Sequence, residues 1–309
     1  MDEPSHEVLQ RIRLPHVRLI TLAELEKQDV DLLNAKGNRS PVEYYFTCTP
    51  SLPLHILKNH AEVDLVTYLD ADLFFFSNPE SLFHELAARS IGIIPHRFPE
   101  ALKNLEQFGK FNVGWVSFRR DAQGIACLEW WREKCLEWCY DRIEEGRFAD
   151  QKYLDLWPDL FKEGLAILHH KGANLAPWNL ANYHITRRKN SVYVDELQLL
   201  FYHFHGLRSV KTWIYDPQIE LYGTKSSILI LRHIYAPYVR MLKQQAKMAS
   251  PLHNRPVSLH NIRTRHAMTS EQGSLPPHLK LGYKFTEYLR ILKRILLRKY
   301  FCLIRDRVL

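Results

Sequence analysis

The sequence contains no run of 18 or more apolar residues, and its N-terminus, MDEPSHEVLQRIRLPHV, has no apolar signal-peptide core. A membrane-spanning helix needs about 20 apolar residues, and a secretory signal needs a short apolar core behind basic residues. We therefore expect neither in this chain. Long low-complexity stretches and internal repeats are also missing. With 46% hydrophobic and 12% aromatic residues, the 309 residues can bury a sizeable core.

Cysteine is scarce, and its spacing argues against a metal–thiolate site. The chain has five cysteines, an odd number, and no C-x-x-C pair. Cys135 and Cys139 are one turn apart in a predicted helix, where buried thiols are expected rather than zinc ligands. This usage fits a reducing compartment, so we predict a cytoplasmic protein.

Nearly all of the excess positive charge lies in one region of the sequence. The formal net charge is +8, and residues 279–309 hold nine Lys or Arg against two acidic residues, a surplus of +7. The rest of the chain is close to neutral, which argues against a nucleic-acid-binding body. A basic segment at one end of the chain is typical of contact with an anionic surface.

The basic segment, residues 279–309, is also amphipathic. Its apolar residues recur at i, i+3, i+4 and i+7, and basic side chains gather on another face. The pattern predicts a helix that lies in the interface of an anionic membrane. The alternative is a helix docked on the globular core or on another subunit, with solvated Lys and Arg. The one-sided charge favours peripheral association with the cytoplasmic membrane face. Residues 226–278 before it are predicted to form a helix, 228–247, and a proline-rich linker.

Predicted strands and helices alternate along residues 1–225. This alternation predicts an α/β sandwich of three layers. The predicted helices span residues 5–13, 22–33 (capped by Thr21), 39–60 (broken near Pro50 and Pro53), 79–88 and 124–144. The predicted strands span residues 16–21, 65–69, 90–98, 110–120, 165–169, 191–196 and 198–206.

The segment DLVTYLDADLFFF, residues 64–76, carries the clearest chemical signal. Its first apolar run, 65–69, predicts a central strand covered on both faces, and Asp70 and Asp72 follow directly. Two carboxylates one residue apart are costly to bury unless a cation compensates them. Hard divalent cations take carboxylate oxygens and keep coordination sites for a phosphate. The alternative is that both Asp cap a turn before Asn78 and Pro79.

Further polar clusters follow at predicted strand ends and turns. Ligands of open α/β sheets bind outside the carboxyl ends of the strands, so these clusters can share one crevice. Each also has a purely structural alternative: Asp150 could cap a helix, Trp178 and Asn179 could close a turn, and His203 or His205 could be a core histidine. The clusters are Asn112 and Gly114; Asp150 and Gln151; Asn174, Trp178 and Asn179; and His203, His205, Gly206 and Lys211.

The order of these motifs resembles glycosyltransferase family 8 and its relatives of the GT-A fold. In that family, a D-x-D after a strand is followed by F-N-x-G, D-Q-x-x-L, an asparagine-containing loop and H-F-x-G-x-x-K-P-W. This chain has LDADL, FNVG, DQKYL, PWN and HFHGLRSVKTW in the same order between Leu69 and Trp213. Two extra residues separate Gly206 from Lys211, and Thr212 replaces the proline.

The resemblance implies a GT-A-like, Rossmann-like sandwich and a metal-dependent hexosyltransferase. Its donor would be a nucleotide-diphosphate sugar, and the basic segment suggests a polysaccharide or glycolipid precursor as acceptor. The implied metal, Mn²⁺ or Mg²⁺, would be held by Asp70, Asp72 and His203. The implied catalytic residues are Asp150 and Gln151, and the implied substrate-binding residues are Asn112, Gly114, Asn174, Trp178, Asn179, Gly206 and Lys211, the last at phosphate.

One departure from the family concerns the N-terminal part. The family's fold opens with a strand, a helix and a strand that hold base and ribose. Here, one short predicted strand and its flanking helices precede the strand 65–69 that leads to Asp70. We therefore expect the domain over 1–225 to be N-terminally incomplete. The alternative function is a catalytically inactive or truncated glycosyltransferase-like binding protein. A haloacid-dehalogenase-type phosphatase also places D-x-D after a strand, but it requires Thr or Val where Leu73 and Phe74 stand.

Overall fold

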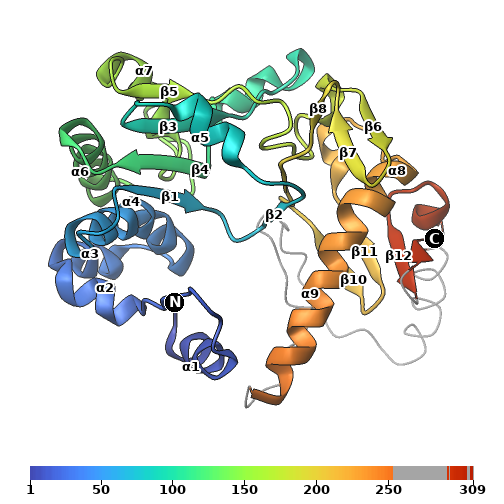
Figure 1. Ribbon diagram of the computed structural model, residues 1–309, viewed down its shortest axis with the longest axis horizontal. Coiled ribbons are helices and arrows are strands. Elements are labelled where there is room, and N and C mark those ends of the chain that lie inside the picture. The colour runs from blue at the N-terminus through green and yellow to red at the C-terminus, as the bar shows by residue number, and fades with distance from the viewer. Residues whose placement is uncertain (253–290, 292, 305–306, 309) are drawn as a thin grey trace.

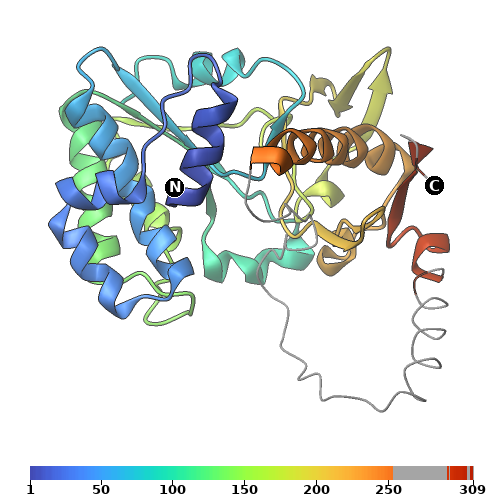
Figure 2. The same ribbon diagram turned by 90° about the horizontal axis from the view of Figure 1, so that it is seen from below.

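The computed structural model describes residues 1–252, 291, 293–304 and 307–308. The described elements form two lobes, which lie side by side in both ribbon views (Figure 1 and Figure 2). The α-helices are α1 (Glu3–Ile12), α2 (Leu22–Gln28), α3 (Val30–Ala35), α4 (Pro41–Asn59), α5 (Glu80–Leu86), α6 (Ala122–Glu137), α7 (Trp157–Leu160), α8 (Ile228–Ile230) and α9 (Ala236–Ala249). The strands are β1 (Leu65–Leu69), β2 (Leu73–Phe75), β3 (Ile91–Pro95), β4 (Phe111–Arg119), β5 (Leu165–Ile167), β6 (Ile185–Arg188), β7 (Ser191–Val194), β8 (Leu197–Gln198), β9 (Phe201–His203), β10 (Arg208–Lys211), β11 (Ile214–Asp216), β12 (Phe301–Ile304) and β13 (Arg307–Val308).

The first lobe is built on a four-stranded sheet in the order β1-β4-β3-β5. Strand β4 is antiparallel to β1 and β3, and β3 is parallel to β5. Helices α4 and α6 cover one face, where Leu57 and Trp131 share a core with Phe118 of β4. Helix α5 and the β2–β9 pair cover the other face around Trp115 and Phe201. The predicted α/β sandwich is confirmed.

Strand β1 lies at the edge of this sheet and not at its centre. Among the described residues it pairs only with β4, with Leu65 opposite Arg119 and Leu69 opposite Trp115. Its residues are half-buried, and Leu69 is exposed. The prediction of a central strand covered on both faces was therefore wrong, since the apolar residues of β1 pack mainly on the α4 side.

The N-terminal region differs from the prediction in three places. The segment 16–21 contains no strand, and α4 continues through Pro50 and Pro53. A proline inside a helix removes a backbone hydrogen bond, but burial of Leu54 and Leu57 stabilises this helix. The predicted helix 22–33 is split at Asp29, which caps α3 and pairs with Arg132 of α6.

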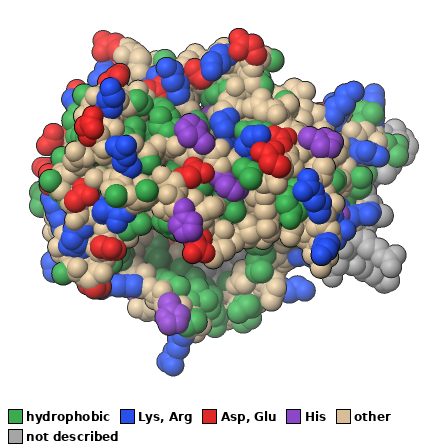
Figure 3. Space-filling view, turned by 45° about the horizontal axis from the view of Figure 1, so that its top comes forward, with side chains coloured by type: hydrophobic (Ala, Val, Ile, Leu, Met, Phe, Trp, Pro, Cys, Tyr) green, Lys and Arg blue, Asp and Glu red, His purple; other side chains and the backbone are tan. Residues whose placement is uncertain are grey.

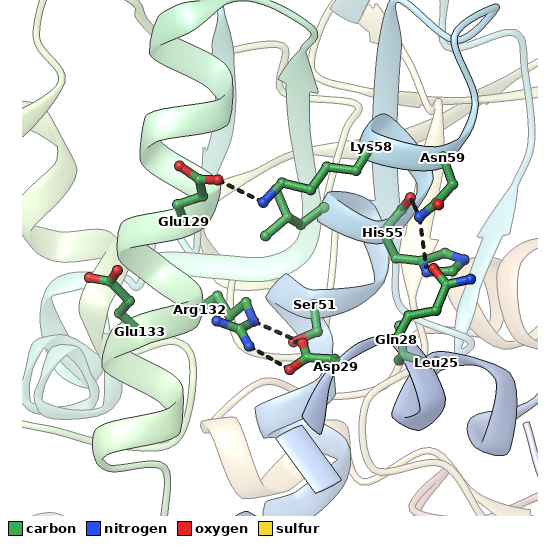
Figure 4. Close-up of a pocket in the computed structure, with 11 residues that line it drawn as sticks. Leu25, Gln28, Asp29, Ser51, His55, Lys58, Asn59, Glu129, Arg132 and Glu133 are labelled. Atoms are coloured by element: carbon green, nitrogen blue, oxygen red, sulfur yellow. Dashed lines mark hydrogen bonds and ion pairs between the residues drawn. The ribbon is translucent and has the colours of Figure 1, made fainter. Parts of the chain in front are cut away.

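Figure 4 shows the region between α2, α4 and α6, which is held by charge pairs. Both Nε and Nη2 of Arg132 donate to the Asp29 carboxylate, which also accepts a hydrogen bond from Ser51 Oγ at 3.0 Å. Lys58 Nζ lies 2.7 Å from Glu129 Oε1. Each of these two cations already has a carboxylate, so this cluster connects helices. We call it the helix junction.

The second lobe combines the meander β6-β7-β8 with the sheet β10-β11-β12-β13. Both pack on α8, α9 and the π-helix Leu231–Tyr235 around a core that includes Ile234, Val239 and Phe204. Strand β2 follows β1 of the first lobe directly in the sequence, but it pairs with β9. This pairing joins the two lobes and positions the site described below.

The predicted helix over 279–309 was wrong at its C-terminal end. Residues 291 and 293–296 are helical, but the chain then turns and forms β12 and β13. Tyr215 of β11 pairs with Phe301, and both Phe301 and Leu303 are buried. The apolar residues at this end therefore fill the protein core. Residues 279–290 and the linker from 253 to 278 lie outside the described residues, and the domain boundaries at 225 and 278 stay predictions.

Candidate metal centre

Two strand pairings bring the predicted metal ligands together. Strand β1 ends at Leu69, and the turn Asp70–Asp72 leads into β2, whose Leu73 lies opposite His203 of β9. Backbone hydrogen bonds fix the turn, from Asp70 N to Gly114 O at 3.2 Å and from Phe204 N to Asp72 O at 2.9 Å. The sequence separation between the aspartates and His203 is thus closed by backbone pairing.

The side chains at this point form a compact group of oxygen and nitrogen ligands. His203 Nε2 lies 3.0 Å from Asp72 Oδ1 and 3.8 Å from Asp70 Oδ2. Ligand atoms of Asp72, His203 and His205 lie within 4.8 Å of one another. His203 is buried, whereas the two carboxylates are 31% exposed and face a cavity of about 460 Å³. His205, weighed above as a core histidine, belongs to the same group.

A chain of hydrogen bonds fixes the tautomer of His203. Gln151 Nε2 donates to Phe108 O at 3.0 Å, so Gln151 Oε1 accepts from Asn112 Nδ2 at 3.3 Å. Asn112 Oδ1 accepts from Gly114 N at 3.2 Å and lies 3.2 Å from His203 Nδ1. Nδ1 must therefore carry the proton and donate it to Asn112. Nε2 is left to face the carboxylates, as in metal-binding histidines whose other nitrogen is held by an acceptor.

Burial and mutual charge shift the pKa values of this group in opposite directions. Burial raises the pKa of Asp70 more than nearby His203 lowers it. Burial alone would also raise the pKa of Asp72, but its contact with His203 lowers it overall. The pKa of His203 is raised, because the attraction of Asp72 and Asp70 outweighs burial. Charged groups in such an arrangement favour a bound cation.

The donor set fits a divalent cation of the Mn²⁺ or Mg²⁺ kind. Both metals accept carboxylate oxygens, and imidazole nitrogen suits the transition metal better. Asp70, Asp72 and His203 would hold the ion, with His205 as a further ligand. Gly114 permits the packing behind them, since a Cβ there would lie 2.6 Å from Asn112 Oδ1 and 3.0 Å from the His203 ring.

The predicted catalytic pair also lines the cavity. Asp150 is 4% exposed, and its backbone oxygen accepts from Trp131 Nε1 at 2.8 Å. The 3₁₀-helix Lys152–Leu156 that follows has no side-chain cap, so the capping alternative for Asp150 is not what the structure contains. Gln151 connects the cavity to Asn112 as described above.

Besides Gly114, four predicted substrate-binding residues do not line the cavity. Asn179 Nδ2 donates to His96 O and Asn174 O, both at 2.9 Å, and so closes a turn. Asn174 is fully buried with a φ of 54° and donates to Pro95 O. Gly206 adopts a φ of 80° beside Gln218, and Lys211 ends β10. Trp178 does line the cavity. The substrate-binding roles of all five stay predictions.

The sequence interpretation missed His96 and the aromatic walls. His96 is the residue after β3. Its ring stacks on Phe98 with ring centroids 4.7 Å apart, and its Nε2 accepts a hydrogen bond from Asn112 Nδ2 at 3.2 Å. Burial, with a contribution from His203, lowers the pKa of His96 to about 3. Its position after a predicted strand was a usable signal. Phe46, Leu105, Phe108, Phe148 and Tyr222 complete the apolar lining, and Asp141 adds a carboxylate.

Comparisons with known proteins define the family. No family model matches the chain. The uncharacterized protein YfnD of Bacillus subtilis (strain 168) is 33% identical over 249 residues, which cover 79% of this chain and 78% of YfnD. The uncharacterized protein YfnF of the same strain is 35% identical over 218 residues, which cover 68% of this chain and 71% of YfnF. The chain belongs to the family of YfnD and YfnF.

One solved structure with partial similarity is the apo form of mouse xyloside xylosyltransferase 1. The match covers 65% of this chain and 81% of that chain, with 16% identity and a TM-score of 0.38. Similarity at this level carries no argument about activity.

Proposed function

We propose that this chain is a metal-dependent glycosyltransferase that moves a hexose from a nucleotide-diphosphate donor to a polysaccharide or glycolipid precursor. The observation that carries the proposal is the convergence of Asp70, Asp72 and His203, which the motif order had associated, at one cavity. The cavity volume of about 460 Å³ lies within the range of ligand pockets. Asp150 and Gln151, from the third motif, line the same cavity.

The chemistry of glycosyl transfer explains why such a site needs these residue types. A divalent ion, when bound, supplies positive charge to the diphosphate that leaves the sugar. The chain's own residues hold that ion and orient the donor. Asn112 keeps His203 Nε2 directed at the carboxylates, Asp150 and Gln151 face the sugar, and the aromatic walls exclude water from the reacting bond. Lys211 is proposed to reach phosphate in the bound state.

A donor-hydrolysis and transfer assay tests the proposal. The full chain is incubated with Mn²⁺ and hexoses linked to UDP, GDP or dTDP, and released nucleoside diphosphate is measured with and without EDTA. We expect release that requires Mn²⁺ and increases with a suitable glycan acceptor. Donor binding without release would contradict the enzyme and favour the alternative, a catalytically inactive glycosyltransferase-like binding protein.

Membrane association is proposed from the described part of the basic segment. Ile291 and Ile295 pack against Ile214 and Cys302, whereas Leu296 and Leu297 are 83% and 54% exposed between basic residues. On the face drawn in Figure 3, Lys and Arg prevail over the right-hand, C-terminal lobe, while the left-hand lobe carries both signs. Such apolar residues flanked by cations are typical of binding to anionic lipid surfaces. Among the described residues, no helix is long and apolar enough to cross a bilayer.

Liposome flotation tests this part of the proposal. The full chain should float with vesicles that contain anionic lipid and should not float with neutral vesicles. The double variant Leu296→Gln, Leu297→Gln should lose most of this binding, and a matched change at exposed Leu221→Gln should not. Equal flotation of all three proteins would contradict membrane contact through this segment. The cytoplasmic location stays a proposal.

A further inference from the structure

The cavity lining is rich in carboxylates and contains no Lys or Arg among the described residues. The four carboxylates are those of Asp70, Asp72, Asp141 and Asp150. A divalent ion held by Asp70 and Asp72 would compensate the metal end. Of the lining histidines, His203 and His205 lie beside Asp72, and burial lowers the pKa of His96 to about 3. The described lining therefore offers no Lys or Arg to a carboxylate on a bound sugar.

Aromatic rings make up much of the rest of the cavity lining. Phe108 and Phe148 contact each other edge to face, with ring centroids 4.9 Å apart at 69°. Phe98 stacks on His96 at 12°, and Trp178 contacts the His203 ring edge on, with centroids 5.0 Å apart. Flat apolar surfaces of this kind suit the carbon–hydrogen face of an uncharged sugar ring.

From this combination we propose that the site selects sugars without negative charge and rejects uronic acids. The inference rests on the proposed function, since it assigns the transferred sugar to this cavity. A uronate would bring its carboxylate into a cavity that is also lined by the carboxylates of Asp141 and Asp150, the latter 4% exposed. Like charges repel more strongly there than in water, and a desolvated carboxylate without a partner costs free energy. Both effects discriminate against the anionic sugar.

Matched donor pairs test the selection directly. UDP-glucose is compared with UDP-glucuronic acid, UDP-galactose with UDP-galacturonic acid, and GDP-mannose with GDP-mannuronic acid. Each pair shares its nucleotide and differs only at C6. Dissociation constants are measured by calorimetry with the full chain and Mn²⁺. We expect the neutral member of the pair that binds best to bind at least about tenfold more tightly, or about 1.4 kcal/mol.

Charge variants sharpen this test. Asp141→Lys adds a cation at an exposed position of the cavity lining and should reduce the ratio of the uronate to the neutral-donor dissociation constant severalfold. Asp159→Lys, at an exposed position outside the lining, should leave this ratio unchanged. Equal or tighter binding of the uronate donors by the unmodified chain would overturn the inference.

Turnover is recorded in the same samples and separates the two proposals. A preference for neutral donors without Mn²⁺-dependent release supports the selection and contradicts the transferase. Release with a preference for uronates supports the transferase and overturns the selection. Failure of all six donors to bind contradicts both.

Discussion

The metal centre and the helix junction are both clusters of carboxylates with basic side chains, yet their charges are balanced differently. At the helix junction, Asp29 receives two hydrogen bonds from Arg132, and Lys58 pairs with Glu129. At the candidate metal centre, histidine is the only ionic partner of Asp70 and Asp72 in the described part of the chain, and both face a cavity whose described lining has no Lys or Arg. A cluster that neutralises itself stabilises the fold. One that leaves carboxylates facing a cavity is arranged to receive a cation.

The largest effect that distinguishes the two clusters is expected from Asp72→Asn. Losing a carboxylate ligand should lower Mn²⁺-dependent turnover by about 10³-fold, or about 4 kcal/mol of transition-state stabilisation. The free energy of unfolding should change little, because Asp72 is held only by His203 and backbone. Turnover and urea unfolding are measured on the same preparations, with Asp159→Asn as the control. If the variant keeps its turnover, or if it loses stability together with turnover, the proposed difference between the two clusters is wrong.

The next effect concerns Asn112, which holds the His203 tautomer. Asn112→Leu removes the acceptor for His203 Nδ1–H and should weaken Mn²⁺ binding ten- to hundredfold, as found for partners of metal-binding histidines. Asn112→Asp keeps an acceptor oxygen and should weaken Mn²⁺ binding less than Asn112→Leu does. Mn²⁺ affinity is measured by electron paramagnetic resonance of the free ion. The nitrogen shifts of His203 in metal-free protein should report the proton on Nδ1 in the unmodified chain. An Nδ1 without a proton would contradict the hydrogen-bond assignment.

At the helix junction, Asp29→Asn should act on stability. Removing the partner of a buried ion pair costs about 3–5 kcal/mol. We expect about 2 kcal/mol here, since the Arg132 side chain remains 20% exposed. Urea unfolding at pH 7 measures the loss, and Mn²⁺ affinity should stay within a factor of two. A loss of Mn²⁺ affinity as large as that of Asn112→Leu would show that the junction supports the metal centre.

The same position predicts a pH dependence. Burial alone would raise the pKa of Asp29, but hydrogen bonds from Arg132 and from Leu32 N outweigh it, and the pKa is lowered. A lowered folded pKa means that the contribution is complete above the unfolded value of about 3.9. It is lost as the pH falls through the lower folded pKa. The difference in unfolding free energy between the unmodified chain and Asp29→Asn should therefore be constant from pH 7 to 5 and shrink below pH 4.

Much of this comparison could be anticipated from local sequence, and some of it could not. Local sequence pointed to Asp70 and Asp72 after one apolar run, to Asn112 near the start of another, and to His203 at the end of a third, and each of these runs forms a strand. The β2–β9 pairing that brings them together is non-local, and no local pattern specifies its register. The motif order supplied the association that local patterns lacked.

The errors have the same physical origin. Strand β1 has the composition of a central strand, but edge or centre depends on which segments pair with it. Phe301 and Leu303 fit a helical period, yet pairing with β11 determines their conformation. Lys211 ends β10 opposite Ile214 of β11 and does not line the cavity, and its role at phosphate stays a prediction. The substrate role of Asn179 stays a prediction, and its hydrogen bonds close a turn.

We expect the smallest effect on stability from Lys58→Ala, which removes the exposed ion pair of the helix junction. Lys58 and Glu129 are 54% and 46% exposed, and exposed ion pairs contribute about 0–1 kcal/mol. We expect a loss below about 0.5 kcal/mol that disappears in 1 M salt, because screening weakens exposed pairs. A double-mutant cycle with Glu129→Ala isolates the pair, and Arg132 variants are excluded from it because that side chain contacts Asp29. A coupling above about 1.5 kcal/mol would mean that the junction is held as a single network, so that even its exposed pair is needed to keep α4 against α6.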